Sequence, residues 1–182
     1  MPFSYEYARP AVTVDTILCT LGAHGELRVL LIQRKHDPFA GRWALPGGFV
    51  DEHEDLPAAA RRELQEETHI DVRQVVQLGA YGTPGRDPRG HTVGVAFLAL
   101  IDPDAAVGVA GDDAADCRWF PLHRPPPLAF DHGAMLKDAR ARLAELAADR
   151  AAFARVFCGK HKPAWLERTR RAARLAMRPR TR

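Results

Sequence analysis

The segment GGFVDEHEDLPAAARRELQEETHI, residues 47–70, restricts this chain's fold and chemistry more than any other segment. Its second half consists of strong helix formers, which predict a helix over 55–68. In that helix Glu63, Glu66 and Glu67 stand at i, i+3 and i+4 and therefore share one face. Like charges at this spacing repel each other, so the pattern predicts positive partners for these carboxylates.

Two kinds of partner fit the residues. Arg62 lies four positions before Glu66 and can pair with it. A divalent cation is the other, because Mg²⁺ takes oxygen ligands and often holds phosphates in its remaining positions. A turn at Gly47 and Gly48 would let the backbone approach such a ligand and offer a carbonyl oxygen. A solvated, glutamate-rich helix face explains the same spacing and stays open as an alternative.

The rest of the chain alternates strand and helix patterns. Strands are predicted over 11–21, 27–34, around 43–45, 72–81, 91–101 and 117–122, with loops over 82–90 and 102–116. A long helix is predicted over 131–157, capped by Asp131, and a basic amphipathic helix in the last 25 or so residues. This order favours an α/β fold with a mixed sheet between helices.

Length and composition set further limits. The 182 residues fit one domain with a tail. Residues 155–182 carry a net charge of +9 and the remainder −6, so the basic character belongs to the tail. The longest apolar runs, such as 93–101, are too short for a membrane span, and the first ten residues lack a signal-peptide pattern, so we expect a cytoplasmic protein. The three cysteines are too widely spaced for a metal motif.

The glutamate segment resembles the signature of the Nudix hydrolase family, G-x5-E-x7-R-E-U-x-E-E-x-G-U, where U is apolar. The positions that match in register are Gly48, Glu54, Arg62, Glu63, Leu64, Glu66, Glu67 and Ile70. His69 stands where the family has glycine. That glycine ends the helix in a left-handed conformation, which histidine can adopt, so we interpret His69 as a tolerated helix end and not as a ligand.

The resemblance implies a fold and a reaction. The fold would be the Nudix α/β/α sandwich around a mixed β-sheet, with a Nudix hydrolase domain over 1–150 and a basic C-terminal helical extension over 151–182. The reaction would be the attack of water on the pyrophosphate of a nucleoside diphosphate linked to another moiety. Mg²⁺ (or Mn²⁺) would neutralise the pyrophosphate and activate the water.

The resemblance also implies a role for each matching residue. Glu63, Glu66 and Glu67 would hold the metal, together with the carbonyl of Gly47. Arg62 would orient these glutamates. Glu54 would hold the preceding loop and reach a metal through water. The general base is less defined by the pattern: the loop 102–116 offers no glutamate, and we favour Asp112 or Asp113, although turn-forming aspartates explain the same residues.

The substrate is suggested by the segment GRDPRG, residues 85–90, which is similar to a segment of bacterial ADP-ribose pyrophosphatases. Arg86 and Arg89 lie in a turn-rich segment that we expect to be exposed, where each can bind phosphate in a bidentate manner, although a solvated basic loop is the alternative. Arg34 and Lys35 are further phosphate candidates, and Gly48 would approach the substrate with its backbone. The resemblance therefore favours ADP-ribose, cleaved to AMP and ribose 5-phosphate.

Three alternatives remain open at this point. A related hydrolase could act on oxidised dNTPs or dinucleoside polyphosphates. Some Nudix-like domains are ADP-ribose-sensing transcriptional regulators, but these usually have a damaged signature and a longer C-terminal part, so we expect an enzyme. The arginines of the tail could contact nucleic acid, although a solubilising terminus is favoured.

Aromatic residues near the N-terminus and the family resemblance suggest a homodimer.

Overall fold

The computed structural model describes residues 5–106, 114–157 and 163–175. Its elements are β1 (Ala11–Leu21), β2 (Leu27–Arg34), β3 (Trp43–Ala44), β4 (Gly47–Phe49), α1 (Leu56–Thr68), β5 (Val76–Tyr81), β6 (Thr92–Leu100), a 3-10 turn η1 (Pro103–Ala105), β7 (Ala114–Pro121), α2 (His132–Ala148), α3 (Arg150–Phe157) and α4 (Pro163–Leu175).

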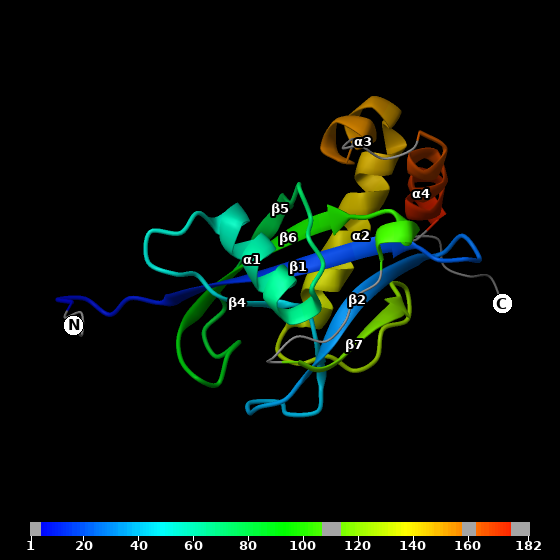
Figure 1. Ribbon diagram of the computed structural model, residues 1–182. Helices are drawn as coiled ribbons and strands as arrows, with labels where there is room; N and C mark the ends of the chain where they lie inside the picture. The colour runs from blue at the N-terminus through cyan, green and yellow to red at the C-terminus, as the bar shows by residue number, and fades with distance from the viewer. Residues whose placement is uncertain (1–4, 107–113, 158–162, 176–182) are drawn as a thin grey trace.

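The sheet is mixed and β1 lies at its centre (Figure 1). β1 runs parallel to β6 along one edge, and β6 pairs with the antiparallel β5. On its other edge β1 pairs with β4 near its start and with β2 near its end. β2 continues outward to β7 and also pairs with β3. The register of β1 and β4 sets Asp15 opposite Gly47, which places the glycine pair at the middle of the sheet.

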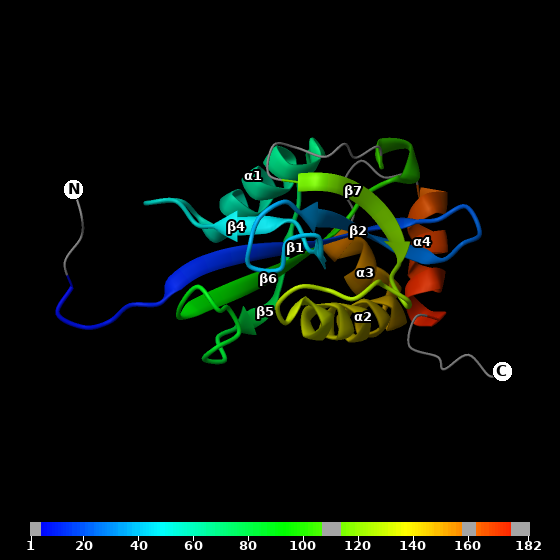
Figure 2. The same cartoon turned by 90° about the horizontal axis from the view of Figure 1, so that it is seen from below.

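Helices cover both faces of this sheet, as the view from below shows (Figure 2). The alternation of side chains along β1 builds the two cores. Ile17 and Cys19 belong to the core shared with α2, whereas Leu18 packs in the core that contains Leu64 of α1. The predicted α/β/α sandwich around a mixed sheet is therefore confirmed.

Three predicted boundaries are wrong. Residues 47–48 are not a turn but the start of strand β4, because they complete the hydrogen bonding of β1. Strand β5 begins at Val76 instead of residue 72. β7 begins at Ala114 instead of residue 117, since it pairs with β2 as far as Arg34.

The single helix predicted over 131–157 is two helices, α2 and α3. Asp149 has extended backbone angles, and its carboxylate accepts the N–H groups of Ala151 and Ala152 at 2.8 and 3.1 Å. This is the bonding of a helix N-cap, so Asp149 ends α2 and begins α3.

The C-terminal helices share the core of the sheet. Phe153 and Phe157 of α3 and Trp165 and Ala173 of α4 lie in the same buried cluster as Ile17. The outward face of α4 carries exposed arginines at positions 168, 171 and 174. No helix in the described residues is long and apolar enough to cross a membrane.

Candidate functional site

The signature helix α1 is anchored on one side and charged on the other. Ala59, Ala60 and Leu64 are buried against the sheet, so the helix presents its glutamates away from this core. The helix ends at His69, whose backbone is left-handed (φ 56°) and whose N–H donates to the carbonyl of Gln65 at 2.8 Å. His69 is exposed, so the interpretation of His69 as the helix end is confirmed.

Arg62 is the hub of the acidic face. Its guanidinium donates to Glu54 at 2.8 and 2.7 Å, to Glu63 at 2.7 Å and to Glu66 at 3.1 Å. It also donates to the carbonyl of Phe49 at 3.1 Å, which ties α1 to β4. One arginine therefore offsets the repulsion among the clustered acids and fixes the loop between β4 and α1.

Two carboxylates of this network have opposite pKa shifts. The hydrogen bonds from Arg62 lower the pKa of Glu54 to about 2, because they stabilise its ionised form. Burial raises the pKa of Glu63, although the bond from Arg62 opposes that rise. A cation beside Glu63 would stabilise its ionised form in this partly buried position.

Gly47 and Gly48 must be glycines because neighbouring atoms leave no room for a side chain at either position. A Cβ atom on Gly47 would collide with the carbonyl oxygen of Val14 and lie 2.8 Å from the Cα of Asp15. On Gly48 it would lie 2.6 Å from the carboxylate carbon of Glu63. The N–H of Gly47 donates to Glu67 at 2.8 Å. The glycines thus bring backbone atoms within reach of the carboxylates.

The described residues contain no group of three or more His, Cys, Asp or Glu side chains gathered as a metal site. The reason is visible in the bonding: Glu63 and Glu66 turn toward Arg62, and Glu67 accepts from Gly47. Their oxygens are nevertheless the hard donors that Mg²⁺ prefers. The metal role of Glu63, Glu66, Glu67 and the Gly47 carbonyl therefore fits the donor set and stays a prediction.

A cleft of about 390 Å³ lies beside these carboxylates. We call it the acidic cleft. Its lining combines Glu63 and Glu67 with three cationic residues, Arg34, Lys35 and Arg89. A lining that combines carboxylates with cations would suit a metal-bound diphosphate.

The two loop arginines differ from each other, and the prediction that both are exposed is wrong for Arg86. Its side chain is only 5% exposed and bonds to both oxygens of Asp131, at 2.9 and 2.7 Å, and to Thr92 at 3.3 Å. Asp131 consequently makes no side-chain cap for α2. Arg86 lines a pocket, but all three of its nitrogens bond to the protein.

Arg89 lines the acidic cleft, and its role in substrate binding stays a prediction. Asp87 holds it through bonds of 3.0 and 2.7 Å, and its guanidinium lies over the rings of Phe49 and Phe130, at 5.1 and 5.6 Å from their centroids. The guanidinium of Arg34 also lies over the Phe130 ring, 5.0 Å from its centroid. Burial and the charge of Arg89 lower the pKa of Arg34, so these two cations stand close together at the cleft.

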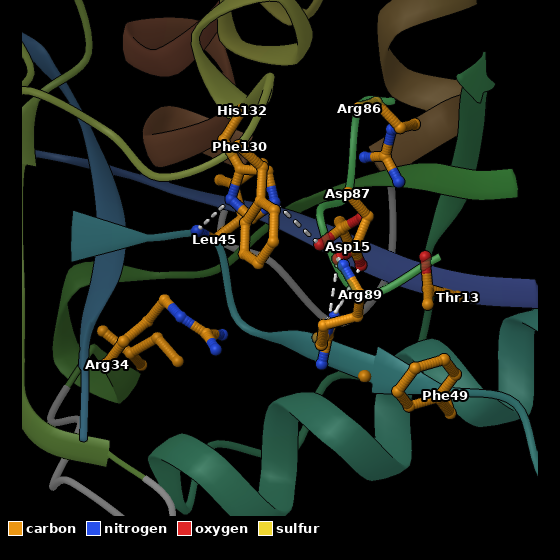
Figure 3. Close-up of a pocket in the computed structure, with 13 residues that line it drawn as sticks. Thr13, Asp15, Arg34, Leu45, Phe49, Arg86, Asp87, Arg89, Phe130 and His132 are labelled. Carbon is orange, nitrogen blue, oxygen red and sulfur yellow. Dashed lines mark hydrogen bonds and ion pairs between the residues drawn. The ribbon is translucent and has the colours of Figure 1, made fainter. Parts of the chain in front are cut away.

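Beside the acidic cleft lies a smaller pocket that sequence reasoning missed (Figure 3). We call it the inner pocket. The residues of its lining that were not predicted as functional include Asp15, Asp87, Phe130 and His132. An aspartate inside the apolar strand pattern 11–21 is the one signal that could have revealed it, because a charged residue at a buried strand position needs a reason.

The remaining predicted residues divide between the cleft and the undescribed part of the chain. Lys35 is exposed and lines the acidic cleft. Arg34 is held by the carbonyls of Pro38 and His36, at 2.8 and 3.3 Å, and lines both the cleft and the inner pocket. Asp112 and Asp113, the favoured general bases, lie outside the described residues.

Comparison with known proteins agrees with this architecture. Residues 10–139 match the NUDIX domain family. An ADP-ribose pyrophosphatase of Methanocaldococcus jannaschii is 42% identical over 132 residues, covering 72% of this chain and 74% of that protein. An ADPR-responsive transcriptional repressor of Acinetobacter baylyi is 40% identical, covering 76% of this chain but only 56% of the repressor.

Solved structures give the same result. NrtR of Shewanella oneidensis superposes with a TM-score of 0.74 and 33% identity, over 90% of this chain and 77% of NrtR. Its NUDIX domain, solved in complex with ADP ribose, superposes with a TM-score of 0.67 and 39% identity, over 75% of this chain and 90% of that domain. With its matching signature, sandwich fold and glycine-supported glutamate helix, the chain belongs to the NUDIX domain family.

Proposed function

We propose that this protein is a metal-dependent Nudix pyrophosphohydrolase that cleaves ADP-ribose to AMP and ribose 5-phosphate. One observation carries the proposal: the carboxylates of α1 and the cations Arg34, Lys35 and Arg89 line a single cleft. The 42% identity to an ADP-ribose pyrophosphatase supports the choice of substrate. So does the ADP ribose bound in the NrtR domain.

The residues of the chain have separate tasks in this proposal. Arg34 and Arg89 bind the two phosphates, and Lys35 adds positive charge at the mouth of the cleft. Gly48 brings the backbone close to the substrate. Arg62 orients the glutamates, and Glu54 holds Arg62 in place through two hydrogen bonds.

Glu63, Glu66, Glu67 and the Gly47 carbonyl would hold Mg²⁺ (or Mn²⁺), which neutralises the pyrophosphate and lowers the pKa of a bound water. The proposed general base is Asp112 or Asp113, just before residue 114 in the sequence. Substitution of each by asparagine tests this assignment, because loss of a general base lowers kcat about 10²- to 10⁴-fold.

The function is tested by incubating the protein with ADP-ribose and Mg²⁺ and measuring AMP release. Glu66→Gln and Glu67→Gln should each remove most of the activity, whereas Glu145→Gln, on the exposed surface of α2, serves as a matched control. Activity that survives both substitutions would refute the metal assignment. A panel with dNTPs, oxidised dNTPs and dinucleoside polyphosphates decides between ADP-ribose and the related substrates.

We also propose a homodimer. Tyr5 and Tyr7 precede β1 and are 50% and 75% exposed, and Val12 at the start of β1 is 38% exposed. Exposed apolar residues grouped on one segment are typical of an interaction site. Light scattering coupled to size-exclusion chromatography should give about twice the mass of 20.1 kDa; a monomer at micromolar concentration would contradict the proposal.

A second candidate function is an ADP-ribose-responsive regulator. The observation that favours it is the extent of the match: NrtR covers 90% of this chain, whereas its NUDIX domain covers 75%. NrtR has also been solved with a 27mer DNA, and that structure superposes over 75% of this chain. A gel-shift assay with duplex DNA, with and without ADP-ribose, separates this function from catalysis.

A further inference from the structure

The inner pocket contains a buried acid–base pair that none of the proposed steps uses. Asp15 on β1 is 7% exposed and His132 at the start of α2 is 4% exposed. Oδ1 of Asp15 lies 3.3 Å from Nε2 of His132. Figure 3 shows the pair beside Asp87 and Arg89, and all four residues line the pocket.

The hydrogen bonding of His132 fixes its role. The backbone N–H of Leu45 donates to its Nδ1 at 2.9 Å, so Nδ1 is an acceptor. Burial lowers the pKa of His132, which keeps the ring neutral. The ring hydrogen therefore lies on Nε2 and points to Asp15, so His132 positions the carboxyl group through one of its two oxygens.

The neighbouring cations have other partners. Arg86 bonds to Asp131 and Thr92 through all three of its nitrogens, and Arg89 is held by Asp87. In the described part of the chain, the Asp15 carboxyl contacts the imidazole of His132 through Oδ1. A buried carboxyl group with acceptor capacity to spare is costly unless a donor reaches it. The residual exposure of Asp15 opens into the inner pocket, where a ligand can supply that donor.

The position of the pocket tells which part of a ligand would reach it. Arg34, Gly48 and Arg89 line both the inner pocket and the acidic cleft, so the two are continuous. A diphosphate bound by the arginines would carry its attached group into the inner pocket. The inner pocket has a volume of about 60 Å³ against about 390 Å³ for the acidic cleft, so the hydroxyl edge of a sugar suits it better than a fused purine.

We propose that Asp15, positioned by His132, is a specificity-determining residue that accepts a hydrogen bond from a hydroxyl of the sugar attached to the distal phosphate. The inference rests on the proposed pyrophosphohydrolase function and assigns the sugar of the substrate to the inner pocket. A carboxylate that binds a ribose hydroxyl is a known solution in nucleotide-binding folds. A substrate without that hydroxyl would leave Asp15 buried and unpaired.

The test compares two substrates that share the diphosphate: ADP-ribose and the β-methyl ester of ADP, which lacks the sugar. Asp15→Ala should lower kcat/KM for ADP-ribose about 10- to 100-fold, because it removes a buried hydrogen-bond partner of the sugar hydroxyl. Asp15→Ala should change kcat/KM for the methyl ester by no more than about twofold. His132→Phe, which removes the positioning bond, should weaken ADP-ribose turnover selectively but by less.

Asp71→Asn, which changes an exposed aspartate after α1, is the matched control and should behave as wild type. Thermal denaturation of each variant shows whether it is folded. An equal loss on both substrates would mean that Asp15 only supports the fold and would overturn the inference. So would unchanged turnover of ADP-ribose by a folded Asp15→Ala variant.

Failure of the proposed function gives a different result. If the wild type hydrolyses neither substrate, isothermal titration with ADP-ribose and ADP still measures recognition of the sugar. A wild-type preference for ADP-ribose that Asp15→Ala abolishes would support the inference without catalysis. Equal affinity of the wild type for ADP-ribose and ADP would overturn it.

Discussion

Arg62 determines how several acids can share one short helix. It bonds to Glu54, Glu63 and Glu66 at once and still reaches the carbonyl of Phe49. Burial of the network is partial, so solvent screens each pair, and the geometry matters more than any single ion pair. The arginine therefore keeps the acidic face assembled.

This arrangement predicts a specific dependence of stability on pH. The pKa of Glu54 is about 2 in the folded protein against an ordinary value of 4.5, so its ionised form stabilises the fold. The contribution is complete above about pH 5 and is lost as the pH falls from about 4.5 toward 2. Urea denaturation of the wild type and Glu54→Gln should show curves that differ at pH 6 and converge near pH 2. Parallel curves throughout that window would contradict the assignment.

His69 supports a second prediction at this scale. Its backbone is left-handed at φ 56°, a conformation that costs a non-glycine residue about 1 kcal/mol. His69→Gly should therefore keep full activity and raise the melting temperature slightly or leave it unchanged. Loss of activity in a folded His69→Gly variant would give the imidazole a functional role.

The sequence could predict residues that belong to one local pattern, and it missed those that the fold assembles. The glutamates and Arg62 share a helix, so their spacing was sufficient. Asp15 and His132 are 117 positions apart and meet only because β1 lies next to the start of α2. Arg86 was predicted to be exposed because its loop is rich in turn residues. The sequence alone does not reveal that Arg86 pairs with Asp131 and is buried.

At the scale of elements, the contact between β4 and β1 sets the distance between the glycines and the carboxylates. Gly47→Ala would push a methyl group into the backbone of Val14 and Asp15. We expect it to lower the free energy of unfolding by about 1–3 kcal/mol and to reduce ADP-ribose hydrolysis, because β4 must move.

Gly133→Ala is the matched control for that substitution, since a Cβ atom there meets nothing within 4 Å. It lies in the first turn of α2, where alanine favours the helix, so its stability should be equal or higher. Urea denaturation measures both variants. If both substitutions changed the free energy of unfolding equally, the close contact at Gly47 would not be the cause of its effect.

The type of each element was predictable where one of its faces is buried. Its boundaries were predicted wrongly where hydrogen bonds outside the local pattern determine them. β1 and β2 have the predicted limits because their apolar runs are long and end in turn residues. The break between α2 and α3 was missed because Asp149 interrupts a sequence of good helix formers. Its two N–H bonds outweigh that local preference.

At the scale of the whole molecule, the site and the C-terminal helices lie on different parts of the sheet. The signature helix α1 covers one face, and α2 with α3 and α4 covers the other (Figure 2). The C-terminal helices nevertheless complete the larger core, to which Trp165 and Phe153 contribute. Stability and catalysis should therefore respond separately to changes in α4.

Trp165→Ala tests that separation. Trp165 is 6% exposed and packs in the cluster shared with the sheet, so its truncation should lower the free energy of unfolding by about 3–5 kcal/mol. Arg168→Ala, one turn further on the exposed face of α4, should change it by less than about 0.5 kcal/mol. Because neither residue lines the acidic cleft or the inner pocket, KM for ADP-ribose should stay unchanged in both variants at a temperature where they are folded. A raised KM in folded Trp165→Ala would show that α4 supports the site, since the effect would have to pass through the sheet.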